Sequence, residues 1–111
     1  MKIKLNDQEL KRVISMYYTD VKHKDVRVSI DPESISVIDS LSLTKREYKS
    51  EEKLSTHELY EIFNYFLGSD YTIKSINTSK VCICDSPMIQ IYGFGNLEVE
   101  FERVVQKVRT R

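Results

Sequence analysis

Two cysteines, Cys82 and Cys84, are the residues whose type and spacing could most directly do chemistry. Residues two apart on a strand point to the same face, so both sulfurs could bind one metal ion, with Asp85, His57 or His23 completing a tetrahedral set. Structural zinc sites usually draw on two closely spaced ligand pairs, and this sequence supplies one. We therefore expect the cysteines to be small apolar residues on a buried strand, with no metal or other cofactor.

The sequence gives little support for two other kinds of functional site, a thiol–imidazole pair and a phosphate-binding loop. A thiol–imidazole pair of Cys82 and His57 would be a nucleophile and its base, but His57 falls in the first turn of an expected helix, where a surface position is usual. Gly93 and Gly95 lack the third glycine and the following Lys-Ser or Lys-Thr of a phosphate-binding loop. We expect no catalytic residues and no enzyme. A metal- or thiol-dependent protein centred on Cys82 and Cys84 stays an alternative.

Two segments have the apolar spacing of helices. The first covers about residues 7–18 after the N-cap Asn6, and the second begins after Ser55 and ends at Gly68. Each N-cap residue is followed three positions later by a glutamate, which is the pattern of a capping box. The apolar stripe of the second helix is expected to consist of Leu59, Ile62, Phe63 and Phe66.

Strand patterns occupy much of the remaining sequence. Residues 26–30 and 35–43 alternate between apolar and polar side chains around a turn at 31–34, which predicts a hairpin. The densely charged residues 44–53 predict a connection that is a solvated loop or a fraying strand end.

A further strand is expected at 71–76. It is followed by a turn at 77–79 and by another strand at 81–84, after which Pro87 interrupts the pattern.

The last segment allows two interpretations. Residues 88–92 and 97–101 favour a hairpin across a Gly-Phe-Gly-Asn loop at 93–96, whereas 97–108 also carries a helical stripe. We favour the hairpin and leave 97–108 open between strand and helix. The sequence as a whole predicts one α+β domain over 1–111, with a mainly antiparallel sheet of four to six strands packed by two or three helices.

The Gly-Phe-Gly-Asn stretch resembles part of another family. The matching residues are Ile89, Gln90, Gly93, Phe94, Gly95, Asn96, Glu98 and Val99. They are similar to a segment of the bacterial histone-like HU family that comes just before the strands of its DNA-binding arms. The resemblance covers about a dozen residues, and Glu100, Phe101 and Glu102 follow where that family continues into a basic run. We interpret the likeness as shared hairpin chemistry and do not carry DNA binding over to this chain.

Composition limits the class of partner. The 111 residues contain 17 basic and 17 acidic side chains, so the totals predict no general attraction to polyanions. No apolar run approaches the roughly 20 residues of a membrane-spanning helix, and the N-terminus lacks the apolar segment of a signal peptide. We expect a cytoplasmic protein without a membrane partner. A nucleic-acid-associated protein that uses the 88–104 hairpin and the basic tail is an alternative; the tail contains Arg103, Lys107, Arg109 and Arg111.

Tyrosine is the most abundant aromatic residue, with seven copies against four phenylalanines and no tryptophan. Tyrosine rings bury a large area while the hydroxyl tolerates water, which suits contact with another protein chain. The predicted interface residues are Tyr17, Tyr18, Tyr48, Tyr60 and Tyr65; the alternative is that these rings merely flank a small core. We expect a small non-enzymatic interaction protein that binds a protein partner or its own copy. Its Lys/Ile-rich composition is typical of bacterial, phage or mobile-element accessory factors, among them inhibitors of host enzymes.

Overall fold

The computed structural model describes residues 1–40, 51–85 and 87–104 of the chain. In chain order the helices and strands are β1 (Lys2–Leu5), α1 (Asp7–Tyr17), the π-helical turn η1 (Tyr18–Lys22), β2 (Val26–Ile30), β3 (Ile35–Asp39), β4 (Glu52–Lys53), α3 (Thr56–Leu67), β5 (Tyr71–Asp85) and β6 (Gln90–Arg103). Tyr48, residues 41–43 of the predicted hairpin and residues 105–111 of the predicted C-terminal tail lie outside the described residues, while Arg103 of that tail ends β6.

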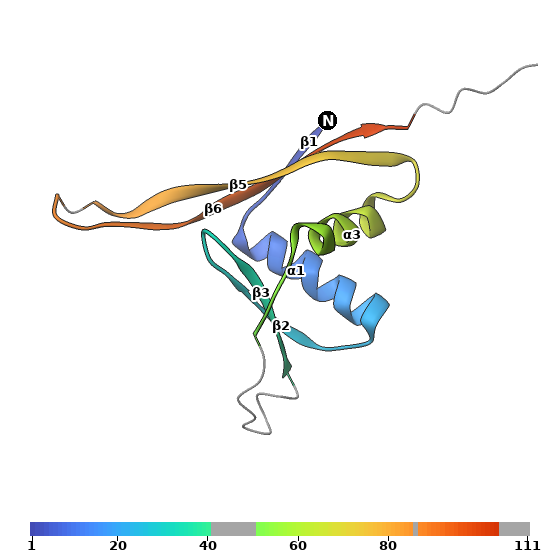
Figure 1. Ribbon diagram of the computed structural model, residues 1–111, viewed down its shortest axis with the longest axis horizontal. Coiled ribbons are helices and arrows are strands. Elements are labelled where there is room, and N and C mark those ends of the chain that lie inside the picture. Colours follow the sequence, from blue (N-terminus) through green and yellow to red (C-terminus); the bar gives the residue numbers. More distant parts are fainter. Residues whose placement is uncertain (41–50, 86, 105–111) are drawn as a thin grey trace, which may run out of the picture.

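The strands form two antiparallel sheets of three strands each among the described residues (Figure 1). One sheet has the order β1-β6-β5, and the other has the order β2-β3-β4. Helix α1 contacts β2 of one sheet and β6 of the other, while α3 packs against β5 and α1. The helices therefore join the two sheets, and the expected α+β architecture is confirmed.

One apolar core holds these layers together. Its buried residues are Leu10, Ile14, Tyr17, Tyr18, Val26, Val28, Ile35, Val37, Ile62, Phe63, Ile73, Leu97, Val99 and Phe101. They come from both helices and both sheets, so burial of this cluster couples elements that are far apart in the sequence.

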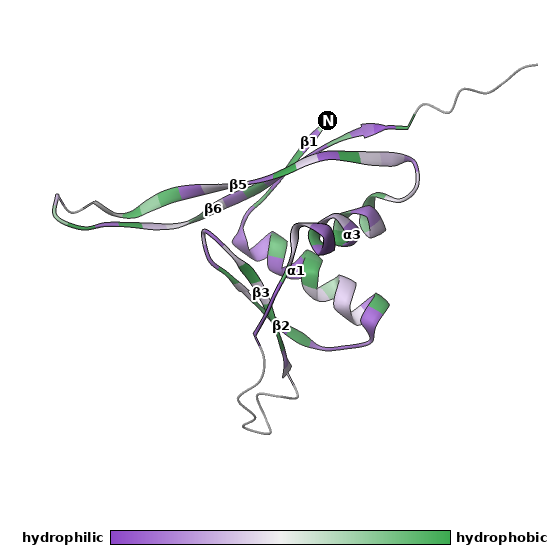
Figure 2. Ribbon diagram, in the orientation of Figure 1, coloured by the Kyte–Doolittle hydropathy of each residue, from purple (hydrophilic) through white to green (hydrophobic). Residues whose placement is uncertain are grey.

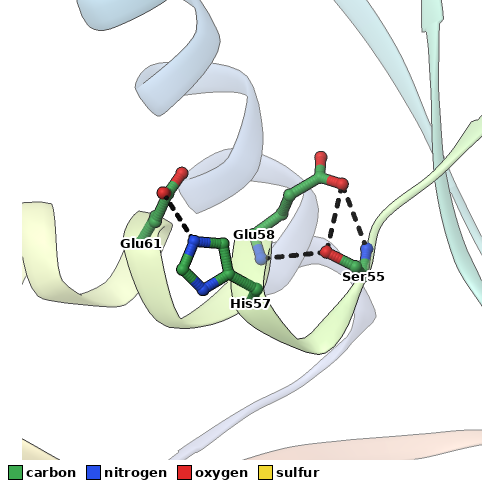
Figure 3. Close-up of polar contacts among 4 residues, drawn as sticks. All are labelled: Ser55, His57, Glu58 and Glu61. Atoms are coloured by element: carbon green, nitrogen blue, oxygen red, sulfur yellow. Dashed lines mark hydrogen bonds and ion pairs between the residues drawn. The ribbon is translucent and has the colours of Figure 1, made fainter.

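Both helices begin where their capping residues predict. The Glu9 N–H donates to Asn6 Oδ1 at 2.8 Å, and the Asn6 N–H donates to Glu9 Oε1 at 3.1 Å. At α3 the Glu58 N–H donates to Ser55 Oγ at 3.2 Å, and the Glu58 carboxylate accepts from the Ser55 N–H and hydroxyl (Figure 3). These bonds satisfy N–H groups that the first helical turn leaves without a partner.

The C-terminal end of α3 is also as predicted in position. Gly68 caps it with φ of 80° and ψ of −177°, a conformation that glycine adopts without a Cβ clash. The apolar stripe differs in one residue, because Phe66 is 40% exposed and not part of the core. It lies beside Tyr65 on the outer side of the helix, with the two rings 5.0 Å apart.

The hairpin of β2 and β3 is confirmed, with Val28 paired to Val37 and the turn at residues 31–34. The sequence left 44–53 open between a solvated loop and a fraying strand end. Residues 44–50 lie outside the described residues, while Glu52 and Lys53 form the short strand β4 and pair with β3. Both β4 side chains are exposed, so their charges do not oppose strand formation at this sheet edge.

Two predicted turns are absent from the described strands. Residues 77–79 lie within β5 and residues 93–96 lie within β6, so the two strands form one long antiparallel ribbon (Figure 1). The chain instead reverses between Asp85 and Gln90, which pair with each other on either side of Pro87. The open question over 97–108 is settled as strand through Arg103.

Register shifts replace the predicted turns. Irregularities in the pairing fall between Ile73 and Ser75, between Thr78 and Lys80, and between Cys82 and Cys84. A β-bulge accommodates an extra residue and increases local twist without ending the strand, so polar or glycine residues there do not require a turn.

Candidate protein-interaction site

The outer part of the ribbon projects beyond the body of the protein. We call it the β-arm: residues 80–85 of β5 and 90–94 of β6, with residues 87–89 between them. In Figure 1 it extends past the β2–β3 hairpin, away from α3. The sheet partner β1 pairs with β6 only from Leu97 to Glu100, so it does not reach the β-arm.

The β-arm is apolar at its surface. Figure 2 shows hydrophobic residues along its part of β5. The exposed large apolar side chains are Val81 (50% exposed), Ile83 (68%), Met88 (90%), Ile89 (61%), Ile91 (51%) and Tyr92 (50%). From residue 81 to residue 94, Asp85 is the single charged residue in the sequence. This density of exposed apolar side chains on one projection is unusual for a surface that faces only water.

Gly93 in the β-arm and Gly95 just beyond it leave room for side chains of β5 on the surface of β6. A Cβ at Gly93 would lie 2.5 Å from Ile83 Cδ1, so the isoleucine side chain already covers that position. A Cβ at Gly95 would lie 2.7 Å from Ser79 Oγ and 3.1 Å from Val81 Cγ1. At both positions side chains of β5 lie across β6, and a close approach of this kind is a recognised reason for glycine inside a strand. Val81 and Ile83 therefore form a continuous apolar surface over the neighbouring strand.

Polar contacts fasten the base of the β-arm. Lys80 Nζ lies 3.1 Å from Glu33 Oε1 in the β2–β3 turn. The Ser79 hydroxyl donates to Asn96 Oδ1 at 3.1 Å, and the Asn96 N–H donates to Ser79 Oγ at 3.1 Å. Phe94 packs against the core from the same end of the β-arm. The base is thus held to the body, while the tip contacts solvent.

A second exposed surface lies on α3. Tyr65 is 48% exposed and stacks edge to face on both Tyr17 and Phe66, with ring centroids 5.7 and 5.0 Å apart. Its hydroxyl donates to Asp20 Oδ2 at 3.5 Å. We call Tyr65 and Phe66 the aromatic surface. It is smaller than the β-arm, and its rings already contact each other.

The structure distributes the predicted interface tyrosines over different environments. Tyr17 and Tyr18 are buried in the core, and Tyr60 is half-buried against it. Tyr65 is exposed, and Tyr48 lies outside the described residues. Burial raises the pKa of Tyr18 to about 12, with the nearby Glu58 and Glu52 carboxylates adding to the shift. The interface role of these residues stays a prediction, for which Tyr65 offers the accessible ring.

No protein-family model matches the chain, and no similar curated protein or similar solved structure is found. Function therefore has to be argued from the surfaces themselves.

The cysteine prediction requires a correction. Cys82 is exposed on the β-arm, so it is not a small apolar residue of a buried strand. The prediction failed because β5 continues past the core. The register shift between Cys82 and Cys84 also interrupts the regular alternation that would place two residues on one face.

The histidines belong to the helical part of the molecule. His57 lies in the first turn of α3, where Nε2 is 3.0 Å from Glu61 Oε1 (Figure 3), and His23 follows η1 with φ of 56°. Within residues 1–40, 51–85 and 87–104, no three metal-ligating side chains gather into a cluster. In the same ranges no helix has the length and apolarity needed to cross a membrane.

The HU-like stretch occupies an unexpected place. Gly93 to Asn96 lie inside β6, and the residues that follow return to the body, where Leu97, Val99 and Phe101 are buried. The projecting segment of this chain thus contains the first part of the matching stretch, whereas the resemblance implies an arm after it. The charges also differ, because Lys80 is the one basic residue of the β-arm and it pairs with Glu33.

The sequence contained a signal for the β-arm that the glycines obscured. Residues 81–83 and 88–92 are apolar stretches on either side of Pro87, and proline is suited to a connection between strands. Centring the hairpin on Pro87 in place of Gly93 would have predicted the β-arm.

Proposed function

We propose that this protein is a small non-enzymatic interaction protein that binds a protein partner through the β-arm. The observation that carries the proposal is a set of six exposed apolar side chains between residues 81 and 94, a stretch with one charged residue. They are Val81, Ile83, Met88, Ile89, Ile91 and Tyr92. Such a surface gains free energy when another apolar surface removes it from water, because hydrophobic stabilisation grows with the buried area.

The ribbon architecture supports the same proposal. A two-stranded hairpin is marginally stable in water by itself, and three or more strands or a packed face are needed to stabilise it. Between Phe94 and the tip, the β-arm has neither a third strand nor a face packed on the core, among the described residues. A bound protein would supply the missing packing face or the missing third strand.

The cellular setting is part of the proposal. The composition suits an accessory factor of a bacterium, phage or mobile element that acts in the cytoplasm, and an inhibitor of a host enzyme is one such role. A projecting apolar hairpin fits this role because it can enter a groove that a globular surface cannot reach.

The test is capture of a partner from host lysate with three tagged variants. Ile83→Lys places a charge on the most exposed apolar residue of the strands, Met16→Lys is a control at a 47% exposed position on α1, and Tyr65→Ala probes the aromatic surface. We expect one protein, identified by mass spectrometry and then bound in purified form, to be captured by wild type and Met16→Lys but lost with Ile83→Lys.

The outcomes separate the two surfaces. Loss with Tyr65→Ala alone would assign the interaction to the aromatic surface and contradict the role of the β-arm. A wild-type protein that captures nothing and does not self-associate would contradict an interaction function altogether.

A further inference from the structure

We propose that the β-arm binds a second copy of this chain, by antiparallel pairing of the two β6 edges around a two-fold axis near Gly93. The product would be a continuous four-stranded sheet in the order β5-β6-β6-β5. This inference rests on the proposed function, because it names the partner of the same β-arm.

The two edges of the β-arm differ in how open they are. Within the β-arm, the β5 edge includes the charged residues Lys80 and Asp85, and charges on an edge strand discourage pairing with another strand. The β6 edge from Gln90 to Phe94 has no charge and no proline, and its register with β5 shifts by one residue only opposite Ile83, where β5 carries the extra residue. Within the described part of the chain, β6 is paired there with β5 alone. Both edges of the β-arm are thus unpaired among the described residues, and the uncharged edge is the one on β6.

The sequence of this edge complements itself. In antiparallel pairing centred on Gly93, Tyr92 of one copy lies opposite Phe94 of the other, and this aromatic pair occurs twice. Ile91 lies opposite Gly95 of the second copy, so a large side chain meets a small one. Cross-strand aromatic pairs favour a sheet of this register.

Charge favours a second copy as the occupant. A two-fold contact places like charges together, which penalises charged surfaces, but residues 90–96 contain no charge. Pairing of the β6 edges brings together Ile91 and Tyr92, which are 51% and 50% exposed, whereas Val81 and Ile83 lie on β5, one strand away. The contact is therefore smaller than the roughly 800 Å² per partner of a standard interface, and we expect a dimer of modest affinity.

Light scattering and sedimentation of the purified full chain, from low micromolar to millimolar concentration, test the inference. We expect wild type to reach twice the 13.1 kDa chain mass. Tyr92→Lys and Tyr92→Glu should each stay at the single-chain mass, with dimerisation at least tenfold weaker. In the dimer the two substituted positions are diagonal neighbours about 7–8 Å apart, where like charges repel.

An equimolar mixture of the two Tyr92 variants gives the sharpest result. Opposite charges should restore the double mass, and native mass spectrometry should show one chain of each kind. Recovery by mixing also proves that both variants fold. Met16→Lys, which lies off the β-arm, should remain dimeric.

Three outcomes would overturn the inference. They are a wild type of single-chain mass at every concentration, Tyr92 variants that still dimerise, and a mixture that stays monomeric. A monomer whose β-arm variants lose a different captured protein would refute self-pairing while leaving the proposed function intact. A monomer that binds neutral phosphatidylcholine vesicles through the β-arm would refute both.

Discussion

The free energy of unfolding should fall as the pH becomes alkaline, and replacement of Tyr18 by phenylalanine should remove part of this fall. Tyr18 is 9% exposed at the start of η1, and burial raises the pKa of its hydroxyl from 10.0 to about 12. Carboxylates of Glu58 and Glu52 and the neighbouring Tyr17 add to this shift, because negative charge nearby also disfavours the phenolate.

The sign and size follow from the two states. The unfolded chain ionises this tyrosine near its ordinary pKa of 10.0, whereas the folded protein keeps the proton until about pH 12. Tyr18 therefore contributes its full stabilisation to the free energy of unfolding below pH 10. This stabilisation is lost as the pH rises from 10 through 12. Two pKa units at 1.36 kcal/mol each correspond to a ceiling of about 2.7 kcal/mol.

Urea unfolding of wild type and Tyr18→Phe at a series of pH values from 8 to 12 measures this loss. Ionisation of other groups affects both proteins, so the difference between their unfolding free energies isolates Tyr18. We expect wild type to lose up to about 2.7 kcal/mol more than Tyr18→Phe over this range. Identical pH dependence in both proteins would refute the reasoning and would mean that water reaches the hydroxyl in the folded state.

Three further substitutions test the core, the ribbon and a helix cap. Phe63→Ala should lower the free energy of unfolding by about 3–5 kcal/mol in urea titrations, because the buried ring leaves a cavity; a loss below about 1 kcal/mol would place the ring outside the core. Gly95→Ala should raise the rate of amide hydrogen exchange in the β-arm more than Gly93→Ala does. The reason is that a Cβ at Gly95 would meet a backbone oxygen at 3.1 Å, while a Cβ at Gly93 would meet only a movable side chain. The reverse order of exchange rates would contradict the packing described. Ser55→Ala should cost about 1 kcal/mol in thermal unfolding through loss of the cap, and an unchanged midpoint would show that the α3 capping box does not contribute.

The helices could be predicted from sequence because their signals are local. Asn6 and Glu9, like Ser55 and Glu58, are three residues apart and fix the start of a helix through their own bonds. The β2–β3 hairpin was equally accessible, since its two alternating stretches are joined by a short polar turn.

The ribbon could not be predicted in the same way, because the role of its glycines depends on the opposite strand. From the sequence alone, Gly93 is a residue that permits a turn. In the structure it lies inside β6, and the side chain of Ile83 covers it. Nothing within a few residues of Gly93 in the sequence distinguishes the two. The burial of Tyr17 and Tyr18, by contrast, follows a local pattern, because both continue the one-face spacing of Leu10 and Ile14 along the helix.

The irregular pairing near Asn96 has a consequence for how this chain can vary. Phe94 and Leu97 both contact the core although they are three residues apart, so the inward-facing positions change from even to odd numbers between them. One strand therefore serves two phases of alternation: its C-terminal half supplies the interior of the domain, and its N-terminal half presents a separate apolar face. Removing a single residue at this point would give both halves of β6 the same alternation. Every side chain of the outer segment would then point to the opposite face of the ribbon. Length at this position is consequently constrained more tightly than residue identity.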